Sequence, residues 1–96
     1  MDSEIEIIHW LRKRNYTHNF EVSANHKLVS DDIEGEFSPG EVKIEYTYRF
    51  EGDSNPEDMS IVYALKTGNG LKGILIDAYG VYSNELVDEF ITQIPN

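Results

Sequence analysis

The chain has 96 residues, of which 40% are apolar, and its 18 acidic and 8 basic residues give a formal net charge of −10. This length supports one α+β domain, 1–96, with a single modest core. A field of this sign repels phosphate backbones and anionic lipids, so we expect neither a nucleic-acid nor a membrane partner. The absence of cysteine excludes disulfides, thiolate catalysis and Cys-ligated metal centres.

The start of the sequence is acidic and lacks the basic and apolar segments of a secretory signal. Its apolar runs, such as 74–76, are all far shorter than the roughly 20 residues of a membrane-spanning helix. We therefore expect a cytoplasmic protein of bacterial type. We interpret the high net negative charge as a feature that keeps the protein soluble. The alternative is that this charge attracts a cationic partner.

A helix is predicted at the beginning of the chain. Ser3 and Glu6 fit a capping box, and Ile7 and Leu11 belong to one apolar stripe. The basic residues at 12–14 suit the negative end of the helix dipole. After this helix the apolar period changes from the helical one to that of a strand.

Alternation at 20–24 predicts a first strand, and 27–29 returns as a second after a turn at 25–26. The segment 30–41 is acidic and contains glycine and proline, so we interpret it as an irregular or edge segment that ends in a turn at Pro39-Gly40.

The clearest strand is 42–50, where five apolar residues at period two predict one face on the core and one in water. Residues 59–66 alternate in the same way, with Val and Ala on the second face, so this strand is expected to be partly covered on both sides. The turn at 67–70 leads to a third strand, 71–79. Ser83 is predicted to cap a final amphipathic helix.

Strands joined by hairpins are antiparallel, because parallel neighbours need long crossover connections. The simplest architecture is a four- or five-stranded antiparallel sheet with the N- and C-terminal amphipathic helices packed on one face.

No catalytic constellation is visible in the sequence. His9, His18 and His26 lack the spacing of a zinc site, and no serine has a base and an orienting partner within a known motif. No phosphate-binding glycine loop precedes a helix. We therefore predict no catalytic residue, no metal site and no cofactor.

A cluster of tyrosines is the main candidate for ligand binding. Tyr46 and Tyr48 share the apolar face of one predicted strand, and Tyr63 lies on that of the next. If these strands pair, the rings approach one another, either as core packing or as the lining of a pocket. Arg49 and Asp77 are the charged residues expected beside them, and an unpaired buried Asp77 would have a raised pKa.

The loop 51–58 is longer than a hairpin needs, and long loops on a rigid sheet often carry function. Its carboxylates, Glu51, Asp53, Glu57 and Asp58, suit a cation or a basic partner segment. The beginning of the loop resembles a calcium loop, but no carboxylate closes it. The alternative is an ordered Asn-Pro turn with solvated carboxylates.

The second half of the chain resembles a family of small uncharacterised bacterial proteins, some of whose members carry the label phosphoribosylpyrophosphate synthetase. The resemblance covers roughly residue 37 to the C-terminus and implies one compact fold. It adds no catalytic residue, because the ribose-phosphate loop of that enzyme has no counterpart here. The segments that carry it are 48–56 (YRFEGDSNP), 60–64 (SIVYA), 72–73 and 77–83 (DAYGVYS).

The sequence as a whole predicts a small, non-enzymatic binding or interaction domain, with a homodimer as one expected form. The alternative is a small-ligand-binding protein or an enzyme that uses the tyrosine-lined pocket with Arg49 and Asp77.

Overall fold

The computed structural model describes residues 4–50, 60–78 and 84–95. Neither helix in these ranges has the length and apolar character needed to cross a membrane. The elements in chain order are α1 (Glu4–Arg12), β1 (His18–Val22), β2 (Leu28–Ser30), the short 3-10 helix η1 (Pro39–Glu41), β3 (Val42–Phe50), β4 (Ser60–Thr67), β5 (Lys72–Ala78) and α2 (Glu85–Thr92).

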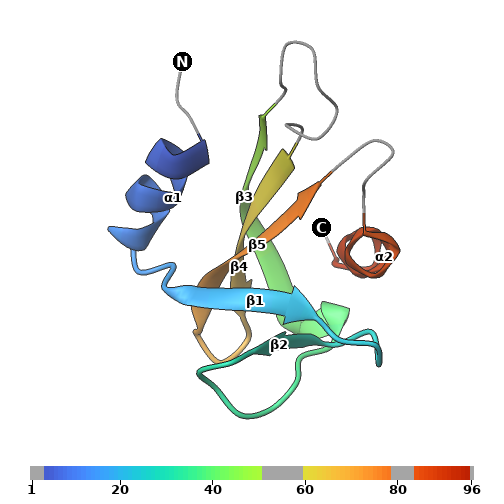
Figure 1. Ribbon diagram of the computed structural model, residues 1–96. Coiled ribbons are helices and arrows are strands. Elements are labelled where there is room, and N and C mark those ends of the chain that lie inside the picture. Colours follow the sequence, from blue (N-terminus) through green and yellow to red (C-terminus); the bar gives the residue numbers. More distant parts are fainter. Residues whose placement is uncertain (1–3, 51–59, 79–83, 96) are drawn as a thin grey trace.

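The strands form one five-stranded sheet in the order β2-β1-β5-β4-β3 (Figure 1). The predicted α+β class and strand number are confirmed. The prediction of a wholly antiparallel sheet is wrong, because β1 pairs with β5 in parallel. Turn chemistry predicts only the direction of strands that are neighbours in the chain, whereas β1 and β5 are separated by β2, β3 and β4.

The parallel pair depends on a close approach at Gly73. A Cβ at this position would lie 2.4 Å from the carbonyl oxygen of His18. The ladder contains only the pairs His18–Gly73 and Asn19–Ile74, after which β1 diverges and pairs with β2. Glycine is therefore required where the two backbones meet.

The two helices lie on opposite sides of the sheet (Figure 1). Ile61, Tyr63 and Leu65 of β4 pack in one cluster with α2, whereas Val62 and Ala64 pack in another with α1. The prediction that both helices cover one face is therefore wrong. The central strands β4 and β5 carry apolar side chains on both faces, and each face needs its own cover.

We call the two halves of the core the α2 side and the α1 side. The α2 side consists of Phe20, Leu28, Val42, Ile61, Tyr63, Leu65, Leu75, Val87, Phe90 and Ile94. The α1 side consists of Ile7, Leu11, Tyr16, Val62, Ala64 and Ile74, with Ile8, Trp10, Tyr48 and Phe50 packed against it.

A β-bulge interrupts β3. Ile44 lies opposite Leu65 and Tyr46 lies opposite Ala64, so Glu45 has no partner residue on β4. One extra residue turns the rest of the strand over. Ile44 consequently packs on the α2 side and Tyr48 on the α1 side, and the predicted single apolar face of 42–50 is divided in two.

The remaining expectations concern the ends of elements. Asn84 caps α2, and its side chain accepts a hydrogen bond of 2.9 Å from the backbone N–H of Leu86. The predicted cap Ser83 and the predicted capping residue Ser3 lie outside the described residues. The segment 30–41 is irregular as predicted, and within it Phe37 bridges to Leu28 and η1 precedes β3.

Candidate functional site

The five residues predicted to bind a ligand do not meet at one place. Tyr48 packs on the α1 side and Tyr63 on the α2 side, although their strands pair. Arg49 and Asp77 both lie opposite Ile61 on neighbouring strands, which places them on the α2 side with Tyr63. The bulge thus leaves Tyr46 and Tyr48 on the other face, and the predicted tyrosine-lined pocket does not assemble.

Asp77 is the buried carboxylate of the α2 side, with 5% of its surface exposed. Its Oδ1 accepts a 3.0 Å hydrogen bond from the backbone N–H of Asn84, whereas its Oδ2 is buried without a hydrogen-bond partner among the described residues. Burial raises the pKa of Asp77 to about 6; the Asn84 N–H opposes this and the nearby Asp88 carboxyl adds to it. The group ties the beginning of α2 to the end of β5.

Tyr63 shares this environment. Its pKa is raised by burial first and then by the negative charges of Asp77 and Asp88, while Arg49 acts in the opposite direction. The described part of this face combines acids with a phenol and offers no nucleophile with an adjacent base. Its arrangement fits the anchoring of α2 better than chemistry on a substrate.

The α1 side carries a different feature, an aromatic cluster of Trp10, Tyr16, Tyr46 and Tyr48. The Tyr46 ring lies at its centre, with ring centroids 5.5 Å from Trp10, 6.2 Å from Tyr16 and 6.3 Å from Tyr48. Edge-on contacts join Tyr46 to Trp10 and Tyr16, as aromatic quadrupoles favour. Because Tyr46 is 42% exposed, the cluster is open to solvent.

Two cations lie on the rings of this cluster. The Arg14 guanidinium is 3.6 Å from the centroid of the Trp10 ring, and the Lys72 ammonium is 4.2 Å from that of Tyr16. Lys72 Nζ also donates a 2.8 Å hydrogen bond to the carbonyl oxygen of Arg14. The end of α1 is thereby attached to β5, and two cations lie at the rim of the aromatic cluster. One carboxylate also lies there: after burial, the negative charge of Glu45 and its hydrogen bond with the Tyr16 hydroxyl raise the pKa of Tyr16.

Three lysines form a row across the sheet next to the aromatic cluster. Lys43 lies opposite Lys66, and Lys66 lies opposite Lys72. Residues directly opposite one another share a face, so all three side chains leave the sheet on the α1 side. Neighbouring like charges in such a row destabilise a sheet by up to about 1 kcal/mol per pair. We call these three residues the lysine row.

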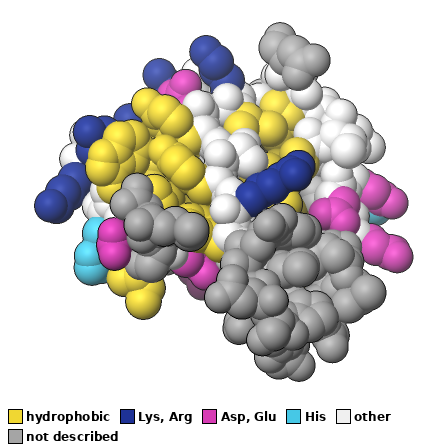
Figure 2. All heavy atoms as spheres, turned by 90° about the horizontal axis from the view of Figure 1, so that it is seen from above, with side chains coloured by type: hydrophobic (Ala, Val, Ile, Leu, Met, Phe, Trp, Pro, Cys, Tyr) yellow, Lys and Arg dark blue, Asp and Glu magenta, His cyan; other side chains and the backbone are white. Residues whose placement is uncertain are grey.

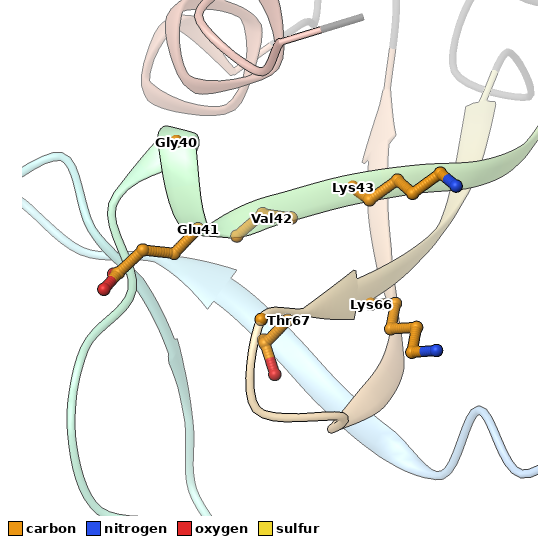
Figure 3. Close-up of a pocket in the computed structure, with 7 residues that line it drawn as sticks. Gly40, Glu41, Val42, Lys43, Lys66 and Thr67 are labelled. Atoms are coloured by element: carbon orange, nitrogen blue, oxygen red, sulfur yellow. The ribbon is translucent and has the colours of Figure 1, made fainter.

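A shallow depression of about 330 Å³ lies between the ends of β3 and β4. Lys43, Lys66, Thr67 and Glu41 are among the residues that line it. The side chains of Lys43 and Lys66 extend in the same direction, whereas Glu41 points the other way (Figure 3). A second depression, of about 390 Å³, is lined by Glu6, Ile7, Trp10 and Tyr48.

The lysine row lacks carboxylate partners within the described residues. The ion pairs there are His18 with Asp32 and His26 with Glu89, and neither includes a lysine. Figure 2 shows exposed hydrophobic side chains on the side of the molecule where α1 lies, with Lys and Arg side chains along one part of their margin and Asp, Glu and His side chains along another. We call the aromatic cluster, Arg14 and the lysine row together the aromatic–lysine surface.

Part of this surface could have been found in the sequence. The turn at 67–70 already places Lys66 opposite Lys72, with Thr67 bonded to Leu71 across it. The third lysine depends on the register of β3 against β4, and the grouping of Tyr46 with Trp10 depends on the bulge. Neither has a local sequence signal.

The other residues considered in the sequence are the carboxylates of the loop 51–58 and the histidines. The loop carboxylates Glu51, Asp53, Glu57 and Asp58 lie outside the described residues. Within 4–50, 60–78 and 84–95, no group of three or more metal-ligating side chains is present. His18 and His26 make surface contacts with carboxylates.

Comparison of the chain with protein-family models, with curated proteins and with solved structures gives no match. The family resemblance of the second half of the sequence therefore stays an expectation.

Proposed function

We propose that this chain is a non-enzymatic binding domain and that its aromatic–lysine surface binds a short acidic peptide segment of a partner protein. The observation that carries this proposal is the lysine row. A chain with 18 acidic and only 8 basic residues places three lysines side by side, without an acidic partner in the described structure.

The energetics of the row support an anionic ligand. Lys43 and Lys66 repel each other in the free protein, and carboxylates of a bound segment would remove that repulsion and add attraction. Lys66 and Lys72 also lie opposite each other, and bound carboxylates would remove their repulsion in the same way. The free energy that the row costs in the unbound protein is therefore recovered on binding.

The neighbouring rings supply the apolar part of the contact. Trp, Tyr and Arg are the residue types most enriched at interface hot spots, and Trp10, Tyr46 and Arg14 lie together here. Tyr46 keeps much of its ring exposed, so a ligand gains apolar burial without displacing a core side chain.

A short acidic peptide fits this surface better than a nucleic acid. The basic area is a single row, whereas the molecule as a whole carries a net charge of −10. A long polyanion would extend beyond the row into a repulsive field, which lowers its affinity. A segment with two or three carboxylates would stay within the row.

Trp10 offers a direct test, because it is the only tryptophan of the chain and lies in the aromatic cluster. We expect hexaglutamate to change its fluorescence at low ionic strength in a saturable manner, and hexalysine to leave the signal of this surface unchanged. The double variant Lys43→Gln/Lys66→Gln should bind hexaglutamate about tenfold more weakly, since two rim charges are removed.

The matched control is Lys27→Gln. Lys27 lies outside the surface, and its Nζ donates a 2.6 Å hydrogen bond to Ser38 Oγ. This variant changes net charge in the same direction and should bind like the wild type. Equal weakening by both variants, or saturable binding of a single-stranded oligonucleotide in preference to hexaglutamate, would contradict the proposal.

Three further predictions from the sequence are independent of this proposal. They are a cytoplasmic location, a homodimer, and a cation or basic partner at the loop 51–58. Light scattering coupled to size-exclusion chromatography tests the homodimer, and a monomer at high concentration would remove it.

A further inference from the structure

The outer side of β3 is an open sheet edge. β3 ends the strand order on one side, and no strand pairs with its outer side within the described residues. The opposite edge is partly covered, because Phe37 exchanges two backbone hydrogen bonds, of 2.9 and 3.0 Å, with Leu28 of β2. The longest strand of the sheet is thus the one left open.

An open edge presents unpaired N–H and C=O groups at alternate residues. An extended peptide can hydrogen-bond to these groups and become an additional strand, with its side chains directed alternately to the two faces. β3 also supplies Lys43, Tyr46 and Tyr48 to the aromatic–lysine surface. Every second side chain of an added strand would therefore lie beside these residues.

We propose that the acidic partner segment binds as a sixth strand along the outer edge of β3, with an acidic side chain beside Lys43 and apolar side chains beside Tyr46 and Tyr48. This inference rests on the proposed function and adds the conformation and pattern of the ligand. Backbone hydrogen bonds supply affinity, and the lysine and the rings supply selectivity.

The bulge at Glu45 contributes to that selectivity. It keeps Lys43 and Tyr46 on one face although they are three residues apart. In a regular strand, residues on one face are separated by two or four positions, so the spacing of the lysine and the ring is specific to this strand. Two copies of this chain are a poorer match for each other, because each carries a net charge of −10. The favoured occupant is consequently a different, acidic-apolar segment.

The experiment compares three terminally blocked octapeptides of the sequence Ser-Glu-Ser-Glu-Ser-Val-Ser-Val, in which Glu and Val share one face of the extended chain. One is unmodified, one is N-methylated on every Ser, and one is N-methylated on every Glu and Val. In an extended chain the amides of alternate residues point to opposite edges, so each modification blocks one edge and leaves side chains and charge unchanged. Trp10 fluorescence reports affinity, and amide hydrogen exchange reports protection along β3.

We expect one N-methylated peptide to lose at least about tenfold in affinity and the other to stay within about threefold of the unmodified peptide. Alternate amides of β3 should gain protection with the unmodified peptide. Similar affinities for all three peptides, or equal losses for both modified ones, would overturn strand addition.

The controls separate this inference from the proposed function. Binding of hexaglutamate without binding of the unmodified octapeptide overturns strand addition and leaves the acidic-peptide surface in place. Failure of both ligands overturns both proposals. A doubled mass in light scattering with β3 amides protected in the absence of peptide would assign the edge to a second copy and overturn the peptide inference.

Discussion

The two faces of the sheet are both apolar and are covered to different extents. On the α2 side, Phe90 and Leu75 are 1% exposed, and Val87, Phe90 and Ile94 pack on the strands. On the α1 side, Tyr46 is 42% exposed and the rings are bordered by cations. The α2 side is thus a completed core, whereas the α1 side leaves aromatic side chains exposed to solvent.

The difference arises in β3. If the alternation of 42–50 continued unbroken, all its large apolar side chains would lie on the α2 side. The bulge at Glu45 moves Tyr46, Tyr48 and Phe50 to the α1 side, where the nine-residue α1 covers only part of them. A single inserted residue thereby creates an exposed aromatic surface beside lysines that face the same way.

The largest expected effect is the difference in stability lost when one aromatic side chain is removed from each face. Phe90→Ala should lower the free energy of unfolding by about 3–5 kcal/mol, because it opens a cavity in the completed core. Tyr46→Ala should cost about 1–2 kcal/mol, since the ring is half exposed and its loss removes ring contacts without leaving a closed cavity. Urea denaturation monitored by circular dichroism measures both. Equal losses would show that the α1 side is as tightly packed as the α2 side.

The next effect concerns charge within the completed core. The folded-state pKa of Asp77 is raised from 3.8 to about 6, so the unfolded chain releases this proton first as pH increases. The free energy of unfolding therefore falls between about pH 4 and pH 6, and the full penalty, at most about 3 kcal/mol, is present above pH 6. Below about pH 4 both states are protonated and the penalty disappears.

Asp77→Asn should remove this penalty. Its amide oxygen can keep the hydrogen bond from Asn84, and its amide nitrogen can donate toward Asp88. We expect the variant to be more stable than wild type by about 1–3 kcal/mol at pH 7 and equal to it near pH 4. Denaturation curves at the two pH values measure this, and a variant less stable at pH 7 would show that the carboxylate is favourably bound.

The smallest effect belongs to the lysine row. Lys43→Gln/Lys66→Gln should raise the free energy of unfolding by up to about 1 kcal/mol at low ionic strength, because it removes like charges that face each other. The gain should shrink in 0.5 M salt, where exposed charges are screened. Thermal denaturation at the two salt concentrations provides the measurement. A loss of stability would mean that these lysines are held by attractive contacts.

Local patterns predicted the elements of the fold well. The turn at 67–70 leads from β4 to β5 as expected, and the apolar stripes identified both terminal helices. The arrangement of the elements depends on information that local patterns lack. The parallel pairing of β1 with β5 joins residues more than 50 positions apart. The apolar residues on both faces of β4 are visible in the sequence, but which helix covers each face depends on the tertiary arrangement.

The candidate site was predicted less completely. Tyr46 and Tyr48 were identified as a possible ligand surface, and they do lie together. The sequence pattern groups Tyr63, Arg49 and Asp77 with them, because it gives no sign that the strand is irregular. A bulge has no reliable signature in Lys43–Phe50, where the polar and apolar letters alternate without a break, so only the register of the strands separates the two groups.

The most direct test of the acidic-peptide surface is to map hexaglutamate binding residue by residue, using amide chemical shifts at low ionic strength. We expect saturable shifts at Lys43, Tyr46 and Lys66, with the amides of Tyr63, Leu75 and Phe90 unchanged. Shifts concentrated on the α2 side, or no saturable shift at millimolar hexaglutamate, would contradict it.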